Sequence, residues 1–505
     1  MVLQGERLFA ASTLMAAVAF LLFGYDQGVM SGVVANDRFI EWMGNPSPGL
    51  MGAIVAIYEI GCFAGALSTG RIGDILGRIK TIRLGCTILV LGAVMQTASI
   101  NIAMMIVART VTGVGNGINT ATIPVYQSEL SPPSSRGKGV AFSTTVLVVG
   151  VALAYWLEYG LYFVHGDFAW RFPLAFQMVF GLLLIVASYF LPESPRWLQA
   201  QGRETECKQV LARLWSGCDI KHPRCLREWE EIRDGIEVER HSSASYRELF
   251  SKGKHNNRYR VLLSIGGQLI QQFSGINVIS YYITIVFENF MPTDKAMLMT
   301  GVDGIVYIIG ATSAIYTIDR LGRRKLMYIG LLGQAVTLAL VGACQALVEQ
   351  GGHDALVPAV IIFMIIYNFV FGATWLSLAW LYPSEVFSTL LRAKGNSLST
   401  GANWIGNFIV AEITPILFQS VGYWTFLIFS FANVLFLLPV VLYFPETRGK
   451  SLEEIETLFA VQDEDEEEKT VAVGKKNSTT TAISINSGHR RNPSPRLDDS
   501  VNDNK

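Results

Sequence analysis

The chain has 505 residues, of which 51% are hydrophobic and only 16% are charged, and its formal net charge is -1. A soluble chain usually carries about a quarter charged residues, so this composition is typical of a membrane protein and excludes a multi-domain soluble enzyme. The net charge near zero offers no overall attraction to nucleic acid. The six cysteines match no zinc-binding spacing, and we expect neither a metal nor a cofactor.

Twelve apolar blocks follow one another along the chain, each long enough to cross a hydrocarbon layer of about 30 Å. The first block is too long for a cleavable signal peptide and holds Asp26 in its middle, so we expect it to remain a spanning helix. The predicted fold class is therefore an all-α membrane protein with twelve transmembrane helices. The blocks form two groups of six, at 8-34, 50-70, 82-99, 102-124, 139-160 and 172-191, and at 261-289, 298-318, 326-348, 357-381, 396-418 and 424-444.

A charged segment separates the two groups and predicts a water-exposed linker with short amphipathic helices. The final segment is acidic and then rich in Ser, Thr and Asn, so it cannot bury enough apolar surface to fold. The expected organisation is an N-terminal six-helix bundle at 1-195, a cytoplasmic linker at 196-258, a C-terminal six-helix bundle at 259-448 and a mostly disordered cytoplasmic tail at 449-505.

The basic residues of the short loops indicate the orientation, because Lys and Arg are retained on the cytoplasmic side of a membrane. They concentrate after the second, fourth, eighth and tenth blocks, so we expect both termini and the linker to be cytoplasmic. These residues are Arg71, Arg78, Lys80, Arg83, Arg136, Lys138, Arg320, Arg323, Arg324, Lys325, Arg392 and Lys394.

Three charged motifs recur in both halves on this same side. Such recurrence indicates two parallel, pseudo-symmetric repeats, which place a substrate site at their interface near the membrane midplane. We expect the repeated charges, with Arg71 and Arg320, to form one latch per half that holds the cytoplasmic side shut. A solvated basic loop is the alternative, but it does not explain the repeated acid-to-base spacing. The pairs are Asp74 and Arg78 with Asp319 and Arg323, Glu129 and Arg136 with Glu385 and Arg392, and Glu193 with Glu446.

Asp26, Glu59 and Arg109 are ionisable residues inside predicted spanning helices, where such groups are costly and face a partner or water. A carboxylate and a guanidinium in one bundle can neutralise each other. A carboxylate whose cationic partner comes and goes can also carry a proton. The residues alone leave a permanent structural ion pair and a proton site equally open.

Four amides lie within ten residues of the 261-289 block, at Gln268, Gln271, Gln272 and Asn277. They cannot face lipid, where unpaired polar groups are costly. An amide offers donors and an acceptor that suit the hydroxyls of a neutral polyhydroxy solute, so we favour a binding face over hydrogen bonding between helices. Aromatic and amide side chains recur in the second half at Trp380, Asn403, Trp404 and Asn407.

Taken together, these motifs resemble the sugar porter family of the major facilitator superfamily, over about residues 8-458. The segments Phe23 to Ser31 and Tyr58 to Cys62 are similar to fungal members, including the glycerol and polyol branch and the pentose and hexose transporters. The motifs that carry the resemblance are Arg71-x-Gly-Asp-x-x-Gly-Arg78, Arg109-x-x-x-Gly113, Pro124-x-Tyr-x-x-Glu129, Pro192-Glu-Ser-Pro-Arg-Trp197, Gln271-Gln-x-Ser-Gly-x-Asn277, Asp319-Arg-x-Gly-Arg-Arg324 and Pro445-Glu-Thr-Arg-Gly449.

The resemblance implies the major facilitator fold and assigns roles to individual residues. It implies that Asp26, paired with Arg109, is the proton site. Two positions depart from the family pattern and leave the substrate open: Thr144 stands where many relatives have a sugar-binding Gln, and Tyr307 where Asn is frequent. The implied substrate residues are Gln271, Gln272, Asn277, Trp380 and Asn403, with Tyr281, Tyr282 and Trp404 lining or gating the cavity. We add to this predicted site Gln268, from the same helical face, and Thr144.

We therefore expect a monomeric, proton-coupled importer of a monosaccharide or small polyol in the plasma membrane, in contact with lipid and without a nucleic-acid partner. One alternative is a facilitative uniporter in which Asp26 is only a structural partner of Arg109. The other is a sensor that binds sugar without net transport.

Overall fold

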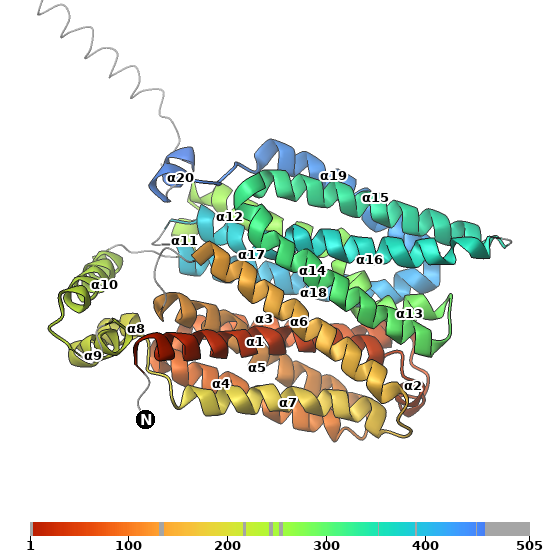
Figure 1. The fold of residues 1–505 in the computed structure, drawn as a ribbon, viewed down its shortest axis with the longest axis horizontal. Helices are drawn as coiled ribbons and strands as arrows, with labels where there is room; N and C mark the ends of the chain where they lie inside the picture. The colour runs from red at the N-terminus through yellow and green to blue at the C-terminus, as the bar shows by residue number, and fades with distance from the viewer. Residues whose placement is uncertain are drawn as a thin grey trace, which may run out of the picture.

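The computed structural model describes residues 4-130, 136-215, 219-241, 246-251, 256-351, 353-388, 391-450 and 452-459. Within these ranges every regular element is a helix, which confirms the all-α prediction (Figure 1). Most of the segment expected as a tail, from residue 460 onward, lies outside the described residues.

Seven helices precede the linker and pack together in the lower part of Figure 1. Ser47 shows why one of them begins where it does: its Oγ accepts from the Leu50 N-H at 3.3 Å, and Pro48 occupies the first helical position. The helices are α1 (Gly5–Val33), the short α2 (Asp37–Trp42), α3 (Pro48–Leu76), α4 (Arg78–Thr97), α5 (Ile102–Leu130), α6 (Arg136–Tyr162) and α7 (Phe168–Ser188).

Four short helices form the linker at one end of the molecule: α8 (Pro195–Ala200), α9 (Glu204–Trp215), α10 (Pro223–His241) and α11 (Tyr246–Leu249) (Figure 1). We call this end the linker face and the opposite end, where α2 lies, the far face. Cys207 and Cys225 are buried within the linker, and burial raises the pKa of the Cys207 thiol to about 12. These two cysteines therefore act as small apolar side chains.

The helices after the linker pack together in the upper part of Figure 1. Two of the expected continuous helices are interrupted, one by the π-helical turn around Gly275 and one at Thr374. Gly275 has a φ of 105°, a conformation that favours glycine. The elements are α12 (Asn257–Gln271), the turn η2 (Gln272–Ile276), α13 (Asn277–Glu288), α14 (Thr293–Leu321), α15 (Arg323–Glu349), η3 (Asp354–Leu356), α16 (Val357–Ala373), α17 (Trp375–Val386), α18 (Arg392–Val421), α19 (Trp424–Tyr443) and α20 (Leu452–Phe459).

In the described part of the chain, eleven helices are long and apolar enough to cross a membrane. The block at 102-124, which is the core of α5, is not among these eleven, although α5 has 29 residues and packs between α3 and α4. Its buried polar residues, Arg109, Asn116 and Asn119, reduce its apolar character. The count of twelve spanning helices therefore stays a prediction that depends on α5.

The two groups of helices meet along packed pairs that include α3 with α18, α6 with α14 and α17, and α1 with α13. Gly304 of α14 shows how close the approach is, because a Cβ added there would lie 3.0 Å from the Ala152 Cβ of α6. Polar side chains on these facing helices are therefore brought together across the interface. We refer to the groups as the N-terminal and C-terminal halves.

Candidate functional site

Two of the predicted substrate amides are joined by a third from a helix far along the chain. Asn403 of α18 donates through Nδ2 to Oε1 of Gln268, at 2.6 Å, and to Oε1 of Gln271, at 2.8 Å. Both glutamines lie on α12, and all three side chains are at most 3% exposed. The predicted face at i, i+3 therefore forms, and Asn403 completes it.

The amides continue through the turn that follows α12. Asn277 donates to Gln272 Oε1 at 2.6 Å, and Gln272 donates to Gln271 Oε1 at 3.5 Å. Because Gly275 breaks the regular helix between them, Asn277 lies within reach of a residue five positions earlier. We call Gln268, Gln271, Gln272, Asn277 and Asn403 the amide network.

The amide network also donates to backbone carbonyls of α17. Gln268 Nε2 donates to the Ala379 carbonyl at 2.8 Å, and Gln271 Nε2 donates to the Trp375 carbonyl at 3.2 Å. The amides thus satisfy one another and the backbone. A hydroxyl-bearing solute would bind here by exchanging for some of these bonds, since alcohols donate and accept as amides do.

Aromatic side chains from both halves meet beside this network. The Phe23 ring of α1 lies 5.4 Å from the Trp404 ring and 6.4 Å from the Trp380 ring, centroid to centroid. Trp404 is fully buried, and its indole Nε1 has no hydrogen-bond partner among the described residues. A buried donor without a partner is costly, so Trp404 offers a free donor at the junction of the halves.

The remaining predicted substrate residues fall into two arrangements. Thr144 of α6 and Ser377 of α17 share a hydrogen bond of 2.7 Å that joins the halves. Tyr282 donates to the Ala411 carbonyl at 2.8 Å, within the C-terminal half. Tyr281, by contrast, reaches across to Glu59 of α3. Thr144 and Tyr281 are therefore placed where relative movement of the halves would change their contacts.

Asp26 and Arg109, expected as a direct pair, are separated by Tyr58. Although both residues are described, no ion pair joins them. Tyr58 donates its hydroxyl to Asp26 Oδ2 at 3.0 Å, and its ring lies 4.8 Å from the Arg109 guanidinium. Arg109 instead donates to the carbonyls of Ile54 at 3.1 Å and Val55 at 2.8 Å.

Sequence reasoning did not select Tyr58 or Asn116, which donates to the Tyr58 hydroxyl at 2.5 Å. It also gave no role to Gln27, which lies beside Glu59. The available signal was the presence of polar residues next to ionisable ones in apolar blocks, Gln27 after Asp26 and Tyr58 before Glu59. We call Asp26, Tyr58, Arg109 and Asn116 the carboxylate cluster.

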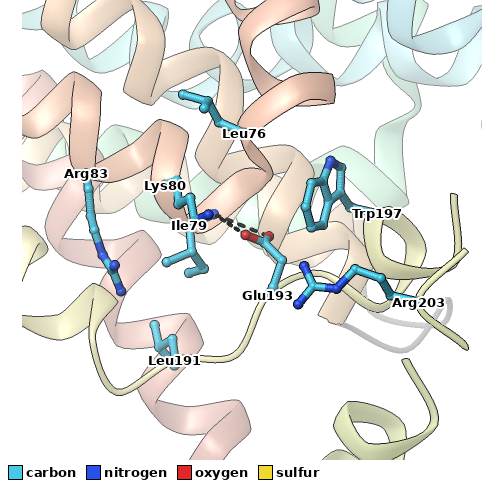
Figure 2. Close-up of a pocket in the computed structure, with 8 residues that line it drawn as sticks. All are labelled: Leu76, Ile79, Lys80, Arg83, Leu191, Glu193, Trp197 and Arg203. Carbon is cyan, nitrogen blue, oxygen red and sulfur yellow. Dashed lines mark hydrogen bonds between the residues drawn. The ribbon is translucent and has the colours of Figure 1, made fainter. Parts of the chain in front are cut away.

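The N-terminal half carries a compact charged cluster at the linker face. Arg78, the first residue of α4, pairs with Glu129 at the end of α5 across 3.0 Å and with Asp74 across 3.7 Å. Glu193 Oε1 accepts from the Arg78 N-H at 2.8 Å, and Figure 2 shows its carboxylate directed at the Ile79 N-H. The carboxylate therefore caps a helix start, where N-H groups lack intrahelical partners.

The C-terminal half repeats this geometry. Arg323, the first residue of α15, pairs with Glu385 at 2.7 Å and with Asp319 at 3.2 Å. Glu446 accepts from the Arg323 N-H at 2.8 Å and from the Arg324 N-H at 3.1 Å. Each charged cluster connects helices of its own half, so its predicted role in closing the linker face stays a prediction.

Other predicted latch residues lie around these clusters. Arg71 and Arg320 are exposed, and Arg392 donates to the Phe387 carbonyl at 3.4 Å. Arg136 begins α6, but its side chain lies outside what the structure describes. A pocket of about 250 Å³ adjoins the N-terminal cluster, and Figure 2 shows the residues that line it, which are Leu76, Ile79, Lys80, Arg83, Leu191, Glu193, Trp197 and Arg203.

Known transporters resemble this chain over most of its length. The family model described as "Sugar (and other) transporter" matches residues 12–459. The chain is 36% identical over 478 residues to Sugar transporter STL1 of Saccharomyces cerevisiae, covering 92% of this chain and 83% of that protein. It is 30% identical to the High-affinity glucose transporter of Kluyveromyces lactis, covering 88% of this chain and 84% of that one.

Solved structures resemble the fold over nearly its whole length. The proton:xylose symporter XylE bound to 6-bromo-6-deoxy-D-glucose superposes with a TM-score of 0.73 at 26% identity, covering 90% of this chain and 99% of that one. A partially occluded, inward-open form of XylE from E. coli superposes with a TM-score of 0.74 at 25% identity, covering 88% of this chain and 99% of that one. These structures support the predicted major facilitator fold.

Proposed function

The chain belongs to the sugar transporter family, and we propose that it is a symporter that imports a monosaccharide or small polyol together with protons. It is not an enzyme. The transporter moves its substrate by alternating access, in which the two halves rock about a site near the membrane midplane. The linker face is then cytoplasmic, the far face is external, and the plasma membrane is the site of import.

The amide network supports a polyhydroxy substrate. Five buried amides from α12, η2, α13 and α18 present donors and acceptors at the junction of the halves. Trp404 adds an unpartnered indole N-H, and Phe23 and Trp380 supply aromatic faces that suit the C-H faces of a sugar ring. The printed names of the relatives, which include sugar and glucose transporters, agree with this substrate class.

The observation that carries proton coupling is the geometry of Asp26. Asp26 is 1% exposed and its carboxyl group accepts a hydrogen bond from Tyr58, while Arg109 makes its hydrogen bonds to backbone carbonyls. A buried carboxyl group without a paired cation favours its protonated form, because an isolated charge is costly there. When Arg109 turns toward Asp26, the carboxylate is stabilised and the proton leaves.

The driving force is sufficient for accumulation. One proton that moves down a membrane potential of 100 mV contributes about 2.3 kcal/mol. At about 1.4 kcal/mol per factor of ten, this supports roughly a 40-fold sugar gradient before any contribution from pH.

Uptake in yeast that lacks its own sugar transporters tests the proposal. The labelled substrates are glucose, xylose, arabinose, galactose and glycerol, each with and without a protonophore. Accumulation above the external concentration that collapses with the protonophore supports symport and identifies the substrate. Equilibration that is insensitive to the protonophore would make the protein a facilitator, and sugar-dependent signalling without uptake would make it a sensor.

A further inference from the structure

A hydrogen-bonded group beside the carboxylate cluster joins the two halves. Glu59 of α3 accepts at Oε1 from the Gln27 amide of α1 at 3.3 Å. The Tyr281 hydroxyl of α13 lies 2.5 Å from the same carboxyl oxygen and 2.6 Å from Gln27 Oε1. Asn407 of α18 donates to Gln27 Oε1 at 3.5 Å. Glu59 is therefore the carboxyl group through which α3 contacts the opposite half.

When Glu59 is ionised, this group has one hydrogen too few for the hydrogen bonds that its geometry indicates. The Tyr281 hydroxyl has one hydrogen, but a carboxylate oxygen and an amide oxygen, both acceptors, lie within hydrogen-bond distance of it. A proton on Glu59 supplies the missing hydrogen, because Glu59 then donates to Tyr281 and Tyr281 donates to Gln27. Exchanging the oxygen and nitrogen of the Gln27 amide does not supply this hydrogen. The Gln27 oxygen would then face Glu59 Oε1 across 3.3 Å, and both atoms would be acceptors.

The surroundings of Glu59 also favour a bound proton. The side chain is fully buried, and its Oε2 has no hydrogen-bond partner among the described residues. Arg109, the cation that acts on Glu59, makes its hydrogen bonds to carbonyls of α3. Among the described residues, the titratable groups that face Glu59 are Asp26 of α1, Tyr58 and Cys62 of α3, Arg109 of α5 and Tyr281 of α13.

The position of Tyr281 links a proton on Glu59 to the movement of α13 relative to α1 and α3. Tyr281 lies one helical turn after Asn277 of the amide network, on the segment that follows the break at Gly275. Ser31 of α1 and Thr284 of α13, one turn closer to the far face, share a further hydrogen bond of 3.0 Å between the halves. Opening of the far face separates α13 from α1 and α3, so it breaks the Glu59 to Tyr281 contact and exposes Glu59 to water.

We propose that Glu59 is a second proton-binding residue of the transport cycle, which takes a proton from external water before α13 closes onto α1 and α3. The proton forms the O-H bond of the Glu59 carboxyl group and is released to water when the linker face is open. The inference rests on the proposed symport, and it adds a proton-binding carboxyl group to the one proposed at Asp26. Protonation at Glu59 sets whether the far face can close.

Infrared spectroscopy of the reconstituted full-length protein tests whether Glu59 binds a proton. We expect the wild type to show a C=O stretching band of a protonated carboxyl group that is missing in Glu59→Gln and present in Glu158→Gln. Glu158 is a matched control because it is buried in the same half and accepts from the Gly32 N-H at 3.0 Å. Tyr281→Phe removes the acceptor of the Glu59 proton, so the band should shift in that variant. Identical carboxyl bands in the wild type and Glu59→Gln would overturn the inference.

Flux measurements test whether that proton is transported. In proteoliposomes with labelled glucose, xylose and glycerol as probes, the sugar gradient that balances an imposed proton gradient gives the proton-to-sugar ratio. The ratio should fall by one in Glu59→Gln and stay unchanged in Glu158→Gln. An unchanged ratio in Glu59→Gln would overturn the inference while leaving symport intact. A wild type that moves no protons would instead overturn the proposed symport, and the transported proton at Glu59 with it.

Discussion

The Tyr58 hydroxyl donates to the Asp26 carboxyl group across 3.0 Å, and the ring of the same tyrosine lies 4.8 Å from the Arg109 guanidinium. One side chain thus contacts both members of the predicted proton site. Asn116 holds the Tyr58 side chain in this position, because its Nδ2 donates to the Tyr58 hydroxyl oxygen at 2.5 Å. We infer that a change of charge at Asp26 reaches Arg109 through Tyr58.

Replacing Tyr58 with Phe is therefore expected to weaken coupling more than transport. The variant loses a hydrogen bond to a carboxyl group, which contributes roughly 1.5 kcal/mol and corresponds to about a tenfold change in population. Steady-state accumulation of substrate should fall by about that factor, while counterflow exchange stays within about threefold of the wild type. Tyr25→Phe is the control, because Tyr25 donates to the Pro173 carbonyl at 2.7 Å and lies outside the carboxylate cluster. Equal losses of accumulation in Tyr58→Phe and Tyr25→Phe would contradict the inference that a change of charge at Asp26 reaches Arg109 through Tyr58.

Asn403→Ala should raise the KM for the substrate by at least about tenfold, since Asn403 donates to both Gln268 and Gln271 and orients them. Initial-rate uptake over a range of substrate concentrations measures this. Gln177→Ala removes a buried amide of α7 whose Nε2 donates to the nearby Leu174 carbonyl at 2.7 Å, and it should leave the KM unchanged. A normal KM in Asn403→Ala would argue that the amide network is structural.

The two helix caps at the linker face should contribute to stability. Glu193→Ala and Glu446→Ala each remove a carboxylate that accepts from two consecutive N-H groups, so each should destabilise the protein by roughly 1–2 kcal/mol. Thermal unfolding in detergent measures the loss. Glu204→Ala removes an exposed partner of Lys208 and should have little effect. If Glu193→Ala and Glu446→Ala lose no more stability than Glu204→Ala, the repeated carboxylates do not act as stabilising helix caps.

Gly77 tests the tightness of the N-terminal charged cluster. Its φ is 87°, and an added Cβ would lie 2.5 Å from Glu193 Oε2. Gly202 has a similar φ of 74° with no atom within 4 Å of an added Cβ. Gly77→Ala should therefore lower the melting temperature more than Gly202→Ala, because both variants incur backbone strain but only the first displaces the cap. Equal melting temperatures would contradict the predicted clash.

The sequence predicted the repeated charged clusters because the same charged residues recur at matching places in both halves, although Glu193 is 115 positions from Arg78 and Glu446 is 123 positions from Arg323. Glu193 and Glu446 stand at equivalent places after the sixth predicted spanning block of each half, and the structure places both at the same kind of helix start. The spacing of Gln268 and Gln271 likewise predicted that their side chains share one face of α12. The repeat and the amide face are both patterns of spacing along the chain, and such patterns are present in the sequence alone.

Contacts between distant helices could not be derived in this way. The approach of Tyr281 to Glu59 joins residues 222 positions apart, and it depends on how α13 turns after Gly275. The position of Tyr58 between Asp26 and Arg109 likewise depends on the rotation of α3 relative to α1 and α5. Helical periodicity indicates which residues share a face, but it does not specify the partner of that face.

The most direct test of proton coupling at Asp26 is transport by Asp26→Asn in proteoliposomes, measured as accumulation and as counterflow with the same labelled substrate. The account predicts that wild-type protein accumulates substrate when an inwardly directed proton gradient is imposed. It predicts that Asp26→Asn catalyses counterflow but accumulates nothing above the external concentration. Full proton-driven accumulation by Asp26→Asn would contradict the account and reduce Asp26 to a structural residue.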